Sequence, residues 1–143
     1  MNKVLITGAF DLLHRGHIEL LRRGSSLGDI LYIGLSTDAT IRRRKGQDRP
    51  INSYEDRAEL LRAITVVHSI YPIRGLTHEQ IMQCTYELVE KLKPDIIVSG
   101  YDRTAEEFVK PLVDRFNWLT YVAMYHGYED NRTGNIIEKV RGE

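Results

Sequence analysis

The sequence predicts an α/β fold: a single-domain, doubly wound (Rossmann-like) five-stranded parallel sheet flanked by helices. Continuous apolar runs such as residues 4–7 and 30–35 are typical of strands that helices bury on both faces. Apolar residues at helical spacing follow each run, which favours β-α-β units with right-handed crossovers. A chain of 143 residues with 42% hydrophobic residues suffices for one core, so we expect one domain over residues 1–143.

The first half of the chain alternates strands and helices. Ser53, followed three residues later by Asp56, is a typical helix start. The segment 42–50 is basic and contains Gly46 and Pro50, which predicts a loop. We expect strands at 4–7, 30–35 and 66–71, and helices from 17 to about 27, from about 39, and from 54 to 64.

The second half repeats this alternation. Thr77 is a good helix cap, Pro94 would stop that helix, and Pro111 would kink the next one. Leu60 and Trp118 are candidates for the core. We expect helices at 77–93, 105–117 and 133–140, and strands at 95–99 and 119–124.

Composition restricts the function classes. Twenty Lys and Arg balance 20 Asp and Glu, which argues against a general nucleic-acid binder because such domains usually carry a basic excess. Cys84 is the only cysteine, so it forms no internal disulfide and suits a reducing compartment as a buried apolar residue. No leader-like or membrane-spanning stretch is evident, and we expect a cytoplasmic protein that binds neither membrane nor nucleic acid.

The stretch GAFDLLHRGH at residues 8–17 follows the first strand and opens a helix. A helix N-terminus after a glycine-bearing turn presents amide groups and a positive dipole end to an anion. His14 and His17 lie three residues apart, about 5–6 Å between Cβ atoms on a helix, so both imidazoles could contact one phosphate. Gly16 leaves room for a ligand to approach the backbone. Two surface histidines at a helix start are the alternative.

This stretch resembles the GxFDxxHxGH signature of the cytidylyltransferase-type nucleotidyltransferases, and its HxGH part is highly specific. The resemblance implies transfer of a nucleoside monophosphate from a nucleoside triphosphate to a phosphorylated acceptor, with release of pyrophosphate. It implies that His14 and His17 stabilise the charge that develops on the transferred phosphate.

The same resemblance implies further site residues. Lys45 matches a family lysine that reaches the phosphates, whereas a solvated face is the better interpretation of the neighbouring arginines 42–44. Arg57 matches a phosphate-holding arginine, with a surface ion pair as the alternative. Asp11 is expected to bind loop amides, and Phe10 to pack beneath the turn. The remaining nucleotide- or phosphate-binding positions are Gly8, Ala9, Gly16, Gly100, Asp102, Arg132 and Thr133.

Local departures from the family pattern leave the substrate open. Ala9 replaces a frequent threonine, and Arg132-Thr133-Gly134 stands where relatives carry Ser-Thr-Thr. The N-terminal half looks most like glycerol-3-phosphate cytidylyltransferase, whereas KGQDRPIN and EDR look more like heptose-phosphate adenylyltransferase domains, and KPDIIVSGYD resembles flavin adenylyltransferases. The leading interpretation is therefore transfer from CTP (or ATP) to a small phosphorylated acceptor such as glycerol 3-phosphate, and the alternative is an ATP-dependent adenylyltransferase that acts on a heptose phosphate or FMN. The resemblance also implies Mg²⁺ bound mainly through the triphosphate, no protein metal site, and a homodimer. A non-catalytic nucleotide-binding relative is the hypothesis from another class.

Overall fold

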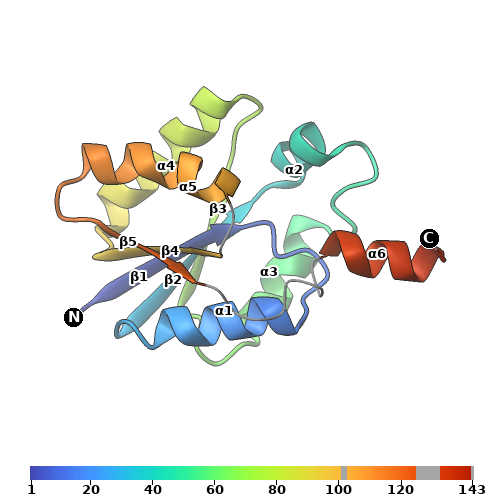
Figure 1. Cartoon of the computed structure of the whole chain (residues 1–143), viewed down its shortest axis with the longest axis horizontal. Helices are drawn as coiled ribbons and strands as arrows, with labels where there is room; N and C mark the ends of the chain where they lie inside the picture. The colour runs from blue at the N-terminus through green and yellow to red at the C-terminus, as the bar shows by residue number, and fades with distance from the viewer. Residues whose placement is uncertain (101–102, 125–132, 143) are drawn as a thin grey trace.

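The computed structural model describes residues 1–100, 103–124 and 133–142, and in them five parallel strands form one sheet between helices (Figure 1). The order of the strands is β3-β2-β1-β4-β5. The strands are β1 (Lys3–Gly8), β2 (Ile30–Ser36), β3 (Ser69–Ile73), β4 (Ile96–Gly100) and β5 (Thr120–Met124). The helices are α1 (Arg15–Ser25), α2 (Asp38–Lys45), α3 (Tyr54–Arg62), α4 (His78–Leu92), α5 (Arg103–Arg115) and α6 (Thr133–Arg141). The predicted doubly wound fold is confirmed.

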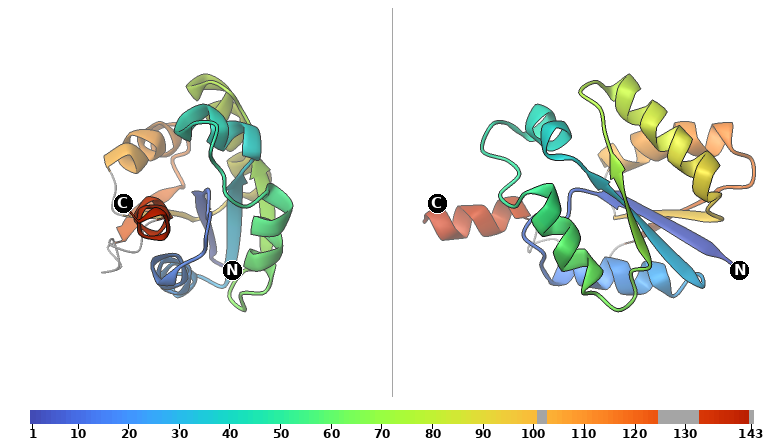
Figure 2. Two further views of the ribbon diagram at one scale, coloured as in Figure 1. Left: turned by 90° about the vertical axis from the view of Figure 1, so that its right-hand side faces the viewer. Right: turned by 180° about the vertical axis from the view of Figure 1, so that it is seen from behind.

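The sheet separates two apolar layers. Helices α4 and α5 pack on one face, where Leu5 and Ile97 point into the core, and α1 and α3 pack on the other, where Val4 and Ile6 do (Figure 2). Alternate residues of β1 thus enter opposite layers, as the pleat of a strand requires. The strand is apolar on both faces for that reason.

The winding reverses at β1, which pairs with β2 on one side and with β4 on the other. The chain first builds outward to β3 and then returns to add β4 and β5. Gly8, Ser36 and Gly100 end their strands at the same carboxyl edge, as predicted. Open parallel sheets bind ligands at such a reversal, so the turn after Gly8 is the candidate ligand site.

Helix capping follows the sequence closely. The hydroxyl of Ser53 accepts from the amide of Asp56, and that of Thr77 accepts from the amide of Gln80. Helix α4 ends at Lys93, whose left-handed backbone (φ 50°) precedes Pro94. Local side-chain chemistry therefore determined where these helices begin and end.

Two predicted boundaries are wrong. Helix α2 continues through Lys45 instead of yielding to a loop at residue 42, because basic side chains in a last turn interact favourably with the helix dipole. Strand β3 lies later than predicted and includes Pro72, which was expected to end it. The strand is at the edge of the sheet, where a residue without an N–H breaks no central ladder.

Three core predictions also differ from the structure. Leu60 is 46% exposed, and on the same helix Arg57 is fully buried. Trp118 is 42% exposed and donates its indole N–H to the carbonyl of Pro94. Cys84 is only half-buried. An apolar periodicity locates a helix face but cannot show when a polar side chain has enough partners to occupy it.

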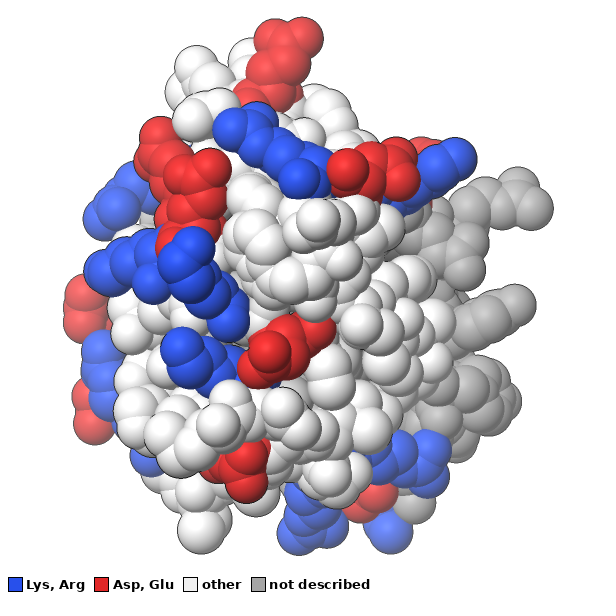
Figure 3. Space-filling view, turned by 90° about the vertical axis from the view of Figure 1, so that its left-hand side faces the viewer, with Lys and Arg blue, Asp and Glu red and all other residues white. Residues whose placement is uncertain are grey.

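Charges of both signs are interspersed over the face at the amino ends of the strands (Figure 3). This face shows no broad area of one sign, in keeping with the zero net charge. No helix in the described ranges is both long and apolar enough to span a bilayer.

Gly34 tests how closely the sheet packs. A Cβ added there would lie 3.0 Å from Thr7 Cγ2 and 3.1 Å from Ile73 Cδ1. We expect Gly34→Ala to lower the free energy of unfolding by about 1–3 kcal/mol in urea titrations, because overpacking displaces these side chains. Gly100→Ala is the matched control: its added Cβ meets no heavy atom of the described residues within 4 Å, and the change should stay within about 0.5 kcal/mol. Equal stabilities for the two variants would contradict this account.

Candidate active site in the turn after β1

The turn between β1 and α1 has an unusual backbone. Phe10 and Leu12 both have positive φ angles, 49° and 50°, which non-glycine residues seldom adopt. Phe10 is buried and turns its ring back toward Gly8, where an added Cβ would lie 3.1 Å from the ring. The prediction that Phe10 packs beneath the turn is confirmed, and Gly8 makes room for it.

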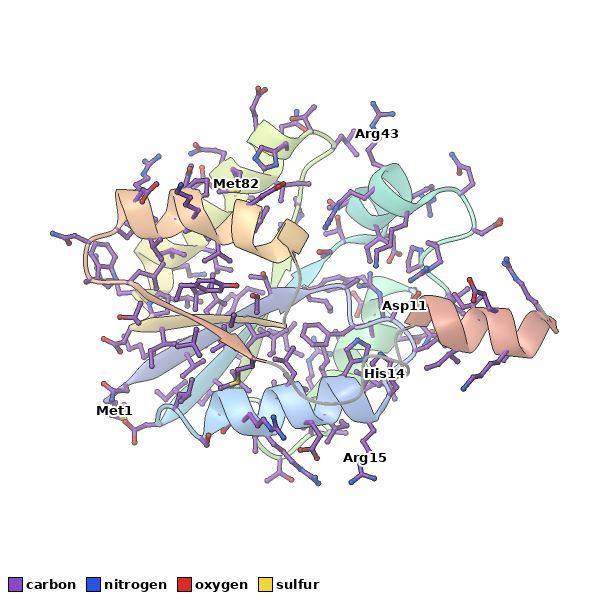
Figure 4. The ribbon with its side chains drawn as sticks, viewed as in Figure 1. Met1, Asp11, His14, Arg15, Arg43 and Met82 are labelled. Carbon is purple, nitrogen blue, oxygen red and sulfur yellow. The ribbon has the colours of Figure 1, made fainter. Side chains whose placement is uncertain are left out.

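His14 caps α1 and His17 is the third residue of that helix. Their rings stack, with centroids 3.8 Å apart and an interplanar angle of 23°. The ring of Phe10 lies 5.3 Å from that of His17. Figure 4 places His14 and Asp11 together at the end of the sheet, whereas Arg15 points away from it. The turn therefore brings two imidazoles to the positive end of a helix, as the spacing predicted.

His17 has a defined hydrogen-bonding role. Its Nδ1 accepts from the backbone amide of His14 at 3.3 Å. A ring nitrogen that accepts a hydrogen bond does not carry the proton, so neutral His17 is assigned the tautomer with the proton on Nε2. In this tautomer the Nε2–H group is the hydrogen-bond donor of the ring.

The carboxylate of Asp11 fastens the turn to the segment before α3. Asp11 is 1% exposed and accepts from the amides of Ile51 at 2.6 Å and Asn52 at 2.9 Å. Arg49 Nε lies 3.6 Å from the same carboxylate. The expectation that Asp11 binds loop amides is confirmed.

Lys45 is the last residue of α2, and its ammonium interacts electrostatically with the Asp11 carboxylate. Although Lys45 is an exposed residue, partial desolvation of its ammonium lowers the pKa of that group, and the neighbouring cations Arg49 and Arg44 lower it further, while Asp11 acts in the opposite direction. An anion beside Lys45 would relieve this crowding of positive charge. The structure thus brings Lys45 to the site, as the resemblance implied.

Arg57 lies beneath the site and is fully buried. Its guanidinium donates to the carbonyls of Ala9 and Ser36, both at 2.8 Å, and to that of Asn52 at 3.0 Å. Its Nη2 forms an ion pair with Asp38 at 2.7 Å. The predicted surface ion pair thus has a buried arginine and a partly exposed Asp38, and contact of Arg57 with phosphate stays a prediction.

The other predicted residues are placed unevenly. Gly16 is buried within the first turn of α1, and Gly100 ends β4 at the carboxyl edge. Thr133 begins α6, but its side chain is not among those described, and Asp102 and Arg132 lie outside the described residues. Arginines 42–44 are exposed, and Arg43 points away from the body of the protein (Figure 4). Among described residues, no group of three or more His, Cys, Asp or Glu side chains could hold a metal ion.

Residues 5–137 match the family described as "Cytidylyltransferase-like". The chain belongs to the cytidylyltransferase-like family, whose members are nucleotidyltransferases. It is 42% identical over 138 residues to "Bifunctional protein HldE" of Helicobacter pylori strain G27 and 38% identical over 138 residues to that of Syntrophotalea carbinolica. These matches cover 96% of this chain but only 27% and 26% of the two relatives, so the chain spans about a quarter of their length.

Solved structures agree with this assignment. The lipopolysaccharide core biosynthesis protein from Thermoplasma volcanium is 30% identical with a TM-score of 0.68, covering 87% of this chain and 98% of that one. Pantoate-beta-alanine ligase from Francisella tularensis gives a TM-score of 0.62 at 17% identity, covers 87% of this chain and 59% of that one, and thus supports the fold alone.

Sequence reasoning missed part of the cytidylyltransferase-like site. It did not identify Asp38 and Asn52 as partners of Arg57, nor the carbonyl of Ser36. Asp38 comes two residues after the end of β2 and is the first residue of α2. Its carboxylate at the start of a helix, beside the carboxyl edge of the sheet, is the sequence signal that could have indicated a partner for Arg57. Backbone carbonyls are present in every residue, so no sequence signal identifies those that accept from Arg57.

The link through Asp11 is open to a direct test. Asp11→Ala removes the buried acceptor of two backbone amides, and we expect the free energy of unfolding to fall by about 2–4 kcal/mol. Hydrogen exchange should be faster at Ile51 and Asn52 than in the wild-type protein. Asp29→Ala, which removes an exposed acceptor for the Asn2 amide, should cost less than about 1 kcal/mol. Wild-type exchange at both amides in the Asp11 variant would disprove the link.

Proposed function

We propose that this chain transfers AMP from ATP to the phosphate of a heptose phosphate and releases pyrophosphate. The observation that carries the proposal is the stacked His14–His17 pair at the N-terminus of α1, with Lys45 alongside. Similarity to HldE proteins supports a heptose-phosphate adenylyltransferase, the alternative rather than the leading interpretation of the sequence. The name of the Thermoplasma neighbour also fits an acceptor from lipopolysaccharide biosynthesis.

The reaction asks for placement and charge stabilisation more than for covalent chemistry. An oxygen of the acceptor phosphate attacks the α-phosphorus in line, a new P–O bond forms, and the bond to the β,γ-diphosphate breaks. The electron pair of that bond leaves with pyrophosphate, so the protein need not remove a proton from an anionic nucleophile.

The residues of the turn would then act as donors to the transferred phosphate. His17 presents Nε2–H, His14 lies stacked against it, and the amides at the start of α1 add their dipole. Lys45 would bind the phosphates as a cation. Mg²⁺ bound through the triphosphate would supply further neutralisation of the leaving group.

Other substrates remain alternatives within the same reaction class. CTP with glycerol 3-phosphate, and ATP with FMN, are favoured only by parts of the sequence pattern. A non-catalytic nucleotide-binding role is favoured by one observation, the replacement of Ser-Thr-Thr by Arg132-Thr133-Gly134. Formation of a homodimer and a cytoplasmic location also stay predictions.

A pyrophosphate-release assay tests the proposed reaction. We expect the chain with Mg²⁺, ATP and heptose 1-phosphate to release pyrophosphate faster than with CTP or with glycerol 3-phosphate or FMN as acceptor. His17→Ala should lower kcat by about 10²–10³-fold, because it removes one preorganised donor to the transferred phosphate.

His68→Ala is the matched control, because His68 is an exposed histidine that hydrogen-bonds its neighbour Ser69. It should retain wild-type turnover. Tight ATP binding in calorimetry without turnover on any acceptor would favour the binding-module alternative, and an active His17→Ala protein would refute the role assigned to that residue.

The lowered pKa of Lys45 predicts a pH dependence. The ammonium loses its proton at a lower pH than an ordinary lysine, so kcat/KM should fall as pH rises through that lowered pKa. Lys45→Arg stays charged over the whole range, and its alkaline limb should move to higher pH even if its maximum is reduced. Arg43→Met, which changes an exposed cation on the same helix, should keep the wild-type profile. An unchanged alkaline limb in Lys45→Arg would assign the limb to another group.

A further inference from the structure

We propose that Arg57 serves nucleotidyl transfer as a positioning residue, holding the turn after β1 against α2, and not as a ligand of substrate phosphate. The inference rests on the proposed function for its effect on rate, but its structural part concerns the protein without substrate. The observations that carry it are the burial of Arg57 and the identity of the groups that its guanidinium contacts.

The guanidinium is already occupied within the protein. A guanidinium has five N–H donors in a rigid plane, and four hydrogen bonds join those of Arg57 to Asn52, Ala9, Ser36 and Asp38. All four donor–acceptor distances lie between 2.7 and 3.0 Å. The residue is 0% exposed. To bind a phosphate from solution, Arg57 would have to break several of these bonds and expose three carbonyls that they satisfy.

The acceptors come from every segment that forms the site. Ala9 belongs to the turn that carries the histidines, and Ser36 ends β2. Asp38 is the first residue of α2, whose last residue is Lys45. One side chain therefore determines how the turn with the histidines lies relative to the helix with the lysine.

Asn52 closes the arrangement into a ring of contacts. Its carbonyl accepts from Arg57, and its amide donates to Asp11, which lies in the same turn as Ala9. Asn52 thus contacts the turn in two ways. It binds the Asp11 carboxylate directly, and it is joined to the Ala9 carbonyl through the Arg57 side chain. Such mutual contacts can maintain the positive φ angles of Phe10 and Leu12.

A lysine cannot reproduce this arrangement. Its ammonium donates from a single point, whereas the four acceptors surround a plane, so Arg57→Lys keeps the charge but loses the geometry. Simple charge stabilisation of a phosphate would tolerate the exchange better. The conservative variant therefore separates the two roles.

The test compares Arg57→Lys with the wild-type protein, first without substrate. We expect amide hydrogen exchange over residues 8–14 and 50–53 to be at least about tenfold faster in the variant. In steady-state assays kcat should fall by about 10²-fold, with KM for ATP and acceptor changed by less than about threefold. Arg62→Lys, an exposed arginine of the same helix paired with Glu59, should leave exchange and kinetics unchanged.

Asp38→Asn is a second variant that tests the same contacts if the Arg57 variant does not fold. It removes the negative charge of the partly exposed Asp38 but leaves an amide oxygen that can still accept, so it should shift exchange and kcat in the same direction by smaller factors. Wild-type exchange in the ligand-free Arg57→Lys protein together with a raised KM would overturn the proposal in favour of a phosphate ligand. Wild-type exchange and kcat in Asp38→Asn would overturn it too. Because exchange needs no substrate, failure of the proposed reaction would be recognised separately.

Discussion

A buried guanidinium is the constraint on which the carboxyl edge of this sheet depends. Removing one partner of a buried charge typically costs about 3–5 kcal/mol, because the remaining charge is left uncompensated away from water. Arg57 satisfies that requirement with three backbone carbonyls and the carboxylate of Asp38. The carbonyls belong to segments far apart in the sequence, so folding must bring those segments together before the arginine can be buried at all. The position of the turn that carries His14 and His17 follows from that requirement.

Asp11 is a buried anion in the same part of the structure, and it too needs partners away from water. Its buried carboxylate is satisfied mainly by two amides of the segment before α3, with Arg49 nearby. The turn thus carries one buried anion that accepts from that segment and one carbonyl, of Ala9, that accepts from Arg57 on α3. The turn supplies the acceptor in both links, and two links restrain it better than either would alone.

The sequence predicts those parts of the fold that depend on local chemistry or periodicity. The caps at Ser53 and Thr77, the buried strands and the signature turn are examples, since each depends on residues within one turn or one strand. Pro72 marks the limit of such local prediction. Whether a strand tolerates proline depends on the position of the strand in the sheet, and the order of the strands is a property of the whole topology. Arg57 and Leu60 show the same limit for the site. The pattern of apolar residues on a helix cannot reveal that carbonyls from distant segments will allow the arginine, and not the leucine, to be buried.

The distribution of cations around the turn would allow a chain of zero net charge to bind phosphates. Arg57 is neutralised internally by Asp38, and Arg49 lies beside Asp11, so neither contributes a full free charge to the surface. Lys45 lies next to both and feels their charge, which is one reason why its pKa is lowered in the absence of an anion. Crowded positive charge is unfavourable in the ligand-free protein and becomes favourable when a phosphate arrives. In the proposed reaction, a preference for an anion would therefore come from the arrangement of a few groups on rigid segments and would not require a basic protein.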